Sequence, residues 1–177
     1  GLTTASIKNG GAMIDTNSFD ITIAQPLLRF DGATTDNLTK KGDGILTLSG
    51  VNTYGGATTV IQGTLRLTQA LNPLNANTGN DASTVTVATG STLDLAYTGT
   101  DIVNKLIIGT TQMASGVYGQ AGSLAPIIGI PEIVGVGTLT VMPEYSLWIA
   151  ETFANGTVPL GKRGPNDDFD NDGINNL

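Results

Sequence analysis

Short runs in which apolar residues alternate with threonine or a charged residue recur along the chain, and this pattern constrains the fold most. In residues 45–49, for example, Leu46 and Leu48 flank Thr47. Successive side chains of a strand point to opposite faces, so one face of each run is buried and the other is solvated. The pattern predicts short strands near residues 6–7, 12–14, 20–23, 45–49, 58–61, 64–67, 84–87, 92–95, 105–108 and 138–141.

The spacing of these runs predicts how the strands are arranged. Leu67 follows Leu48 by 19 residues, and Val87 and Ile107 follow at further steps of 20. A period near 20 is typical of a solenoid whose coils each bury one face on the next. Short strands with glycine and asparagine at the corners favour an all-β parallel β-helix. An antiparallel sandwich, which also joins short strands by regular turns, is the alternative.

Composition excludes several classes of function. The 177 residues include no cysteine and no histidine, which excludes disulfides, Cys/His zinc sites and dyads that need a histidine base. Eight basic residues against 15 acidic ones give a net charge of −7, which argues against nucleic acid as a partner. No run of 18 apolar residues occurs, so no membrane span is predicted.

Two domains are expected, with a boundary at about residue 143. Residues 1–143 are predicted to be parallel β-helix coils, with polar loops at 71–80 and 110–131 leaving the coils. Residues 144–177 are predicted to be a C-terminal cap and linker, in which a short helical stretch holds Trp148, whose ring caps the last coil. The chain starts at Gly rather than Met and stops inside a motif, so we expect it to be a piece of a longer protein.

One stretch has a specific resemblance. Residues 40–67 read KKGDGILTLSGVNTYGGATTVIQGTLRL. This phrase resembles the autotransporter-associated β-strand repeat, K-x-G-x-G-T-L-T-L-S-G-x-N-T-Y-T-G-G-T-T-V-x-x-G-T-L-x-L. Ile45, Gly55 and Ala57 depart from it. The matching positions are Lys40, Gly42, Gly44, Leu46, Thr47, Leu48, Ser49, Gly50, Asn52, Thr53, Tyr54, Gly56, Thr58, Thr59, Val60, Gly63, Thr64, Leu65 and Leu67.

The resemblance implies a right-handed parallel β-helix in the exported passenger region of a large secreted or cell-surface bacterial protein. It implies a structural element and no enzyme. The expected function is therefore a non-catalytic, stiff β-helical stalk. A carbohydrate-binding or adhesive module is an alternative, and a glycan-cleaving β-helix enzyme is a weaker one.

The C-terminal tail contains a calcium-type pattern. Asp168, Asp170 and Asp172 alternate and are followed by Gly173, as in the first half of an EF-hand loop. Calcium is a hard cation that takes six to eight oxygens, so alternate carboxylates suit it. The position that normally carries a bidentate glutamate falls beyond Leu177, and a solvated acidic tail is the alternative. The resemblance to dockerin-like and thrombospondin-type-3-like loops also implies Ca²⁺. The predicted ligands are Asp168, Asp170, Asp172, Ile174 through its carbonyl, and Asn176.

Catalysis on the coils would need convergent carboxylates or a lysine or arginine base. No two acids can be placed on one face at a supported spacing, so we expect solvated outer-face or turn residues. Asp94, between Leu93 and Leu95, is expected to point outward. The candidate acids are Asp15, Asp20, Asp94 and Asp101, and the candidate bases are Lys8, Arg29, Arg66 and Lys105.

Asn52 and three tyrosines carry the remaining expectations. An asparagine at a β-helix corner can stack its amide and cap turn carbonyls, which is a structural role. Exposed Tyr54, Tyr97 and Tyr118 are the alternative, as a platform on which a sugar stacks. An open β-helix end also exposes unpaired backbone groups. The expected partners are therefore the rest of a larger chain or further copies of this one, stacked end to end. A glycan is a further expected partner under the sugar-binding alternative.

Overall fold

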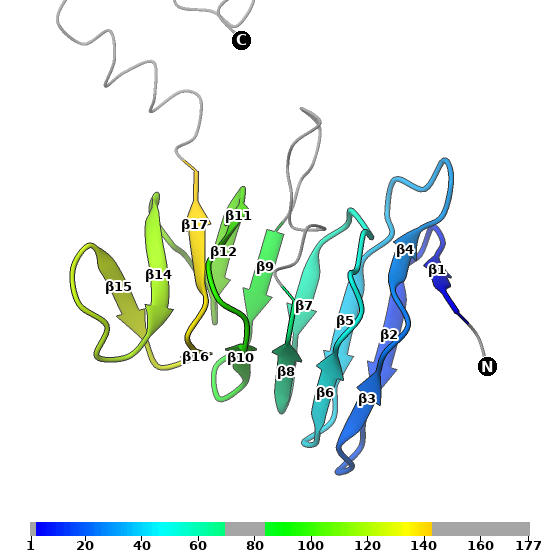
Figure 1. The fold of residues 1–177 in the computed structure, drawn as a ribbon, viewed down its shortest axis with the longest axis horizontal. Helices are drawn as coiled ribbons and strands as arrows, with labels where there is room; N and C mark the ends of the chain where they lie inside the picture. The colour runs from blue at the N-terminus through cyan, green and yellow to red at the C-terminus, as the bar shows by residue number, and fades with distance from the viewer. Residues whose placement is uncertain (1–2, 70–83, 143–177) are drawn as a thin grey trace, which may run out of the picture. The chain divides into compact units, whose positions relative to one another are not determined.

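The computed structural model describes residues 3–69 and 84–142, and every regular element there is a β-strand (Figure 1). Residues 1–142 form one compact unit by themselves. The described residues contain no helix, and so none that is long and apolar enough to cross a membrane. The prediction of an all-β fold is confirmed.

The strands are short, and the ten that the alternating pattern predicts are all present with ends that differ by at most one residue. Seven others were not predicted: β4, β5, β11, β13, β14, β15 and β16. In chain order the strands are β1 (Ala5–Ile7), β2 (Ala12–Asp15), β3 (Ile21–Ile23), β4 (Leu27–Arg29), β5 (Leu38–Lys41), β6 (Ile45–Leu48), β7 (Thr58–Val60), β8 (Thr64–Leu67), β9 (Thr84–Val87), β10 (Thr92–Leu95), β11 (Thr100–Val103), β12 (Lys105–Ile108), β13 (Thr111–Gln112), β14 (Gly116–Gln120), β15 (Ile127–Ile130), β16 (Ile133–Gly135) and β17 (Thr138–Val141).

From β1 to β12, consecutive strands join different sheets, so successive passages of the chain add parallel strands to the same sheets. One sheet has the order β13-β12-β9-β7-β5-β2, and a second has the order β16-β10-β8-β6-β3. Strands β1 and β4 pair in a third sheet, next to a parallel bridge between Leu28 and Thr53. Figure 1 shows the strands of successive passages side by side. This arrangement is compatible with the β-helix that the resemblance implies.

The register corrects the predicted period. Leu48 pairs with Leu67, as the spacing of 19 predicts. Leu67, however, pairs with Leu95, and Val87 belongs to the other sheet. A constant step of 20 is therefore wrong. Parallel pairing fixes only the strands, and the corners can hold loops of different length. Residues 71–80, which are predicted to be a loop, lie outside the described residues.

The core is built from rows of apolar side chains in register. Leu46, Leu65, Leu93 and Ile133 pair from strand to strand and are 0–1 % exposed. Fully burying one such side chain contributes about 1.5–3 kcal/mol. On the outer face of the same strands, Thr47 pairs with Arg66, and Arg66 pairs with Asp94. The rows explain why the alternation of apolar and polar residues was readable in the sequence.

The segment 110–131 is not the protruding loop that its glycines suggested. It contains β13, β14 and β15. Strand β14 pairs with β17 in the antiparallel direction and with β15 in the parallel direction. Gly119 and Gly129 face each other in this pairing, and their small size hides the alternation that marks a strand in sequence.

The two ends of the sheets differ among the described residues. At one end, β1, β2 and β3 each pair along one edge only. At the other end, β13 folds back antiparallel on β12, and β14 is antiparallel to β17. Antiparallel strands therefore interrupt the parallel arrangement at that second end.

Candidate functional site

Four polar residues of the repeat phrase are buried, two of them on strands β5 and β7 and two in the corner between β6 and β7. The phrase runs from β5 through β6 and β7 to the end of β8. Lys40, Asn52, Tyr54 and Thr58 are at most 1 % exposed. Because buried polar groups require hydrogen-bond partners, the contacts of these four residues indicate the role of the phrase.

Lys40 ends in a cluster of oxygen atoms. Its Nζ donates to the carbonyl oxygens of Gly42 at 2.5 Å and Gln62 at 2.9 Å. It also lies 3.2 Å from the carbonyl oxygen of Lys41 and 3.1 Å from Thr16 Oγ1. The ammonium therefore connects residues that follow β2, β5 and β7, three successive strands of one sheet.

Two opposing effects act on the pKa of Lys40. Burial lowers the pKa below its ordinary value, because removing a charge from water disfavours the charged form. The carboxylates of Asp15 and Asp43 raise it. The surrounding carbonyls can only accept hydrogen bonds, so they match the three N–H donors of the protonated form.

Asn52 has the structural corner role that the sequence predicts, with one difference. Its Oδ1 accepts a hydrogen bond from the backbone N–H of Leu27 at 2.9 Å, where amide capping of carbonyls was expected. The carbonyl of Leu27 in turn accepts from the N–H groups of Thr53 at 2.8 Å and Tyr54 at 3.2 Å. Asn52 thus helps to attach one corner of the chain to the start of β4.

The three tyrosines do not form an exposed platform, and that prediction is wrong. Tyr54, Tyr97 and Tyr118 are 0 %, 5 % and 2 % exposed. Their rings add to the apolar core, and each hydroxyl finds a partner there, as buried tyrosines require. The partners are Thr58 Oγ1 at 2.7 Å, the carbonyl oxygen of Thr138 at 3.3 Å and the carbonyl oxygen of Ala114 at 2.8 Å.

Burial raises the pKa of all three tyrosines. For Tyr54 the hydrogen bond with Thr58 opposes the effect of burial, while the carboxylates of Asp101 and Asp36 add to it. The pKa of Tyr97 is raised by burial and by Asp101. Burial alone raises the pKa of the third, Tyr118. The folded state therefore keeps these protons at a pH where the unfolded chain loses them.

Stability is accordingly expected to fall in alkali. A raised folded-state pKa contributes stability below the unfolded value of about 10, and that contribution disappears as the pH rises above it. The free energy of unfolding, measured by urea denaturation, should decrease above pH about 10. Tyr54→Phe should make the decrease less steep, because one titrating group is gone. Titration of all four tyrosines of the chain near pH 10 while the fold persists, followed by absorbance, would contradict this burial.

Two of the candidate acids are exposed, as predicted: Asp15 ends β2, and Asp20 precedes β3. Asp15 Oδ1 accepts the backbone N–H of Asn17 at 2.8 Å, and Asp20 Oδ1 accepts that of Ile45 at 2.8 Å. Asp15 also pairs with Lys41 at 3.6 Å across two half-exposed side chains. These carboxylates organise corners of the chain.

The other two candidate acids are buried, which corrects the expectation that they are solvated. Asp94 lies on the outer face, but it is only 8 % exposed, and its Oδ2 accepts from Arg66 Nε at 2.6 Å. Asp101 on β11 is 7 % exposed, and its Oδ1 accepts the backbone N–H of Ile102 at 3.0 Å. Strand alternation predicts a face, whereas burial depends on what covers that face.

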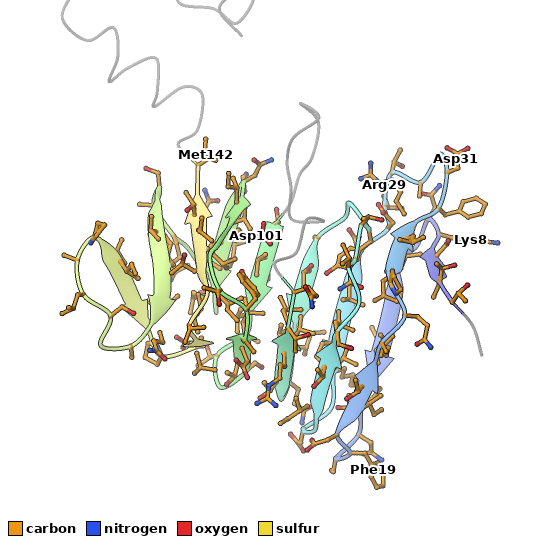
Figure 2. The ribbon with its side chains drawn as sticks, in the orientation of Figure 1. Lys8, Phe19, Arg29, Asp31, Asp101 and Met142 are labelled. Carbon is orange, nitrogen blue, oxygen red and sulfur yellow. The ribbon has the colours of Figure 1, made fainter. Side chains whose placement is uncertain are left out.

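The structure does not bring the candidate acids and bases together into a catalytic arrangement. Lys8 lies over the ring of Phe30 at 4.9 Å, and Lys105 is exposed on β12. Figure 2 shows Lys8 and Arg29 at the end where β1 and β4 lie, away from Asp101. In residues 3–69 and 84–142, no group of three or more acidic side chains is placed to hold a metal ion.

Arg29 and Asp36 explain one departure from the repeat phrase. Asp36 is fully buried, and its Oδ2 accepts from Arg29 Nε at 3.2 Å and from the backbone N–H of Gly55 at 2.7 Å. A Cβ at Gly55 would run into the guanidinium of Arg29. Glycine at this position leaves room for the guanidinium of Arg29 where it crosses the chain.

Several predicted features lie outside the described residues. These are Trp148, the loop 71–80, and the whole calcium-type pattern with Asp168, Asp170, Asp172, Ile174 and Asn176. They remain predictions.

Sequence reasoning did not single out Lys40 and Asp36 for their structural roles. A signal for Lys40 was present, because it follows Leu38 by two residues and so continues the inward face of a strand. Asp36 had no local signal, since its partners Arg29 and Gly55 are distant in sequence and meet only through the stacking of strands.

Comparison with known proteins gives one match. No curated protein and no solved structure matches the chain. Residues 38–67 match the family model of the passenger-associated transport repeat, a structural repeat rather than a catalytic one, and this match supports the resemblance of the phrase to the autotransporter-associated repeat.

Proposed function

We propose that this chain is a non-catalytic structural module of a large secreted or cell-surface bacterial protein, built as a right-handed parallel β-helical stalk. One observation carries the proposal. The polar residues that distinguish the repeat phrase, among them Lys40 and Asn52, are buried and bind the backbone of adjacent strands. A phrase that served ligands would present such residues to solvent.

The same match supports the proposed location. A passenger repeat implies export, so the stalk would hold other parts of the protein outside the cell. Stacked parallel strands suit this task, because each strand pairs with the strand of the next passage in the same sheet.

A matched pair of variants tests the structural role. Asn52→Ala should lower the free energy of unfolding by about 1–3 kcal/mol, since a buried N–H of Leu27 loses its acceptor. Thr47→Ala, on the outer face, should change it by less than about 0.5 kcal/mol. Urea denaturation measures both. Unchanged stability of Asn52→Ala, together with loss of binding on a glycan array, would favour a ligand site.

The sugar-binding and glycan-cleaving alternatives have weaker support. The tyrosines of the predicted platform are buried, and the candidate carboxylates are spread over β2, the residue before β3, β10 and β11. A glycan array and assays on pectin and alginate, with and without Ca²⁺, would reveal either activity.

We also propose end-to-end stacking at β1, β2 and β3, where further coils of a longer chain or of a second copy would add parallel strands. Each of these strands has a free edge in the described unit. Ile21 turns toward the core yet is 36 % exposed there, so an added coil would bury it. The antiparallel β13 and β14 disfavour the same addition at the opposite end, and hence a simple head-to-tail filament.

An edge-blocking variant tests this stacking. On β2 the N–H groups of Ala12 and Thr16 bond to the adjacent strand, so the alternate N–H of Met13 points to the free edge. Met13→Pro should abolish concentration-dependent self-association in light scattering while circular dichroism stays unchanged. Ala12→Pro, which removes an internal bond, should instead destabilise the fold. A wild-type chain that stays monomeric at all concentrations would exclude self-stacking.

For the tail, we propose that the Asp168–Asp172 pattern binds Ca²⁺ once an acidic twelfth residue follows. Calcium titration of the chain with and without that residue, followed by calorimetry, tests the proposal. Absence of binding in the extended chain would contradict it.

A further inference from the structure

The oxygen atoms around Lys40 Nζ have the makeup of a cation site. Three backbone carbonyls, from Gly42, Gln62 and Lys41, and the hydroxyl of Thr16 converge within 3.2 Å of the nitrogen. Every one of these groups can offer an oxygen lone pair to a cation. Lys40 is fully buried, and the oxygens come from three successive passages of the chain.

The position of Lys40 in the sheet separates its stem from its charge. In register with it on the neighbouring strands stand Ile14 and Val60, and the row continues through Val87 to Ile108. All four of these residues are apolar, so the methylene stem of the lysine continues an apolar row. Only its head reaches the corner where the oxygens meet.

Negative charge surrounds the same corner. The carboxylates of Asp15 and Asp43 act on the lysine electrostatically and favour its charged form. Asp15 is also paired with Lys41 at 3.6 Å, and Asp43 Oδ1 accepts from Gln62 Nε2 at 2.7 Å. Carbonyl cages of this kind replace the hydration shell of monovalent cations such as potassium.

We propose that this corner is a monovalent cation site in its own right, which the chain fills with the Lys40 ammonium and which accepts a free alkylammonium ion when that side chain is removed. The cation is the connection between β2, β5 and β7 at this corner. Lys40 therefore supplies this corner of the phrase with its own ion.

Chemical rescue tests the site directly. Lys40→Ala should lower the folding equilibrium constant by about tenfold or more, because a buried charge-assisted set of hydrogen bonds is lost. Propylammonium chloride replaces the atoms beyond Cβ, so it should restore much of the loss. Sodium chloride and tetramethylammonium chloride at equal ionic strength should not, since the first lacks the stem and the second lacks N–H donors.

The adjacent lysine provides the control. Lys41 is half exposed and pairs only with half-exposed Asp15 among the ion pairs described, so Lys41→Ala should lose little stability and show no preference among the salts. If Lys40→Ala does not fold alone, refolding on addition of propylammonium, followed by circular dichroism, is the same measurement.

Two results would overturn the proposal. One is equal stabilisation of Lys40→Ala by all three salts, which would indicate a general salt effect. The other is a Lys40→Met variant as stable as the wild type, which would show that the stem alone matters. Neither outcome would affect the structural role of the repeat, which the Asn52→Ala variant tests separately.

Discussion

Gly63→Ala is expected to lower the free energy of unfolding by about 2–4 kcal/mol, the sum of backbone strain and overpacking. Gly63 has φ +69°, a conformation that disfavours side chains. A Cβ there would lie 2.7 Å from the carbonyl oxygen of Asp43 and would also overlap that of Gly42. Both are backbone atoms of the preceding corner, so relief requires the stacked corners to separate.

Gly90 is the matched control. It has φ +81° at the corresponding corner before β10, yet a Cβ there would meet nothing within 4 Å. Gly90→Ala should therefore show the strain alone, about 1–2 kcal/mol. Urea denaturation of both variants gives the comparison. Equal losses would mean that close stacking of the corners does not contribute at Gly63.

Leu65→Ala is the second variant with a large expected effect, a loss of about 2–5 kcal/mol from the deleted apolar contacts and the cavity left behind. Leu65 is 0 % exposed and pairs in register with Leu46 on one side and Leu93 on the other. The neighbouring side chains of this row cannot move in to fill the space, because backbone hydrogen bonds hold both adjacent strands in place.

An exposed residue near the same strand provides the reference for Leu65. Ile61 is 46 % exposed, and Ile61→Ala should change the free energy of unfolding by less than about 0.5 kcal/mol. Thermal and urea unfolding measure both variants. A loss below about 1 kcal/mol for Leu65→Ala would mean that the apolar row around Leu65 is loosely packed.

Local alternation was sufficient for the strands that follow it. At β6 and β8 the apolar residues sit two apart, and both strands were predicted with their inward faces correct. At β5 the inward row contains Lys40, so the run reads as polar. At β14 glycine removes the side chain that would show the period. Such strands depend on pairing with neighbours, which a single run of sequence does not show.

The candidate site shows the same division. The resemblance of residues 40–67 selected the phrase that a family model also matches. It did not show that Tyr54 is buried, or that Asp36 meets Arg29 and Gly55. These contacts join residues that are far apart along the chain.

By itself the sequence determined the all-β class, ten of the strands, the inward face of strands such as β6 and β8, and the repeat phrase. These features depend on side-chain alternation, which is local. Only the tertiary structure decided the register, as in the pairing of Leu67 with Leu95, and the burial of Lys40 in its oxygen cluster. Loop length at each corner sets which strands meet, and the chain positions that meet then determine which polar groups are buried together.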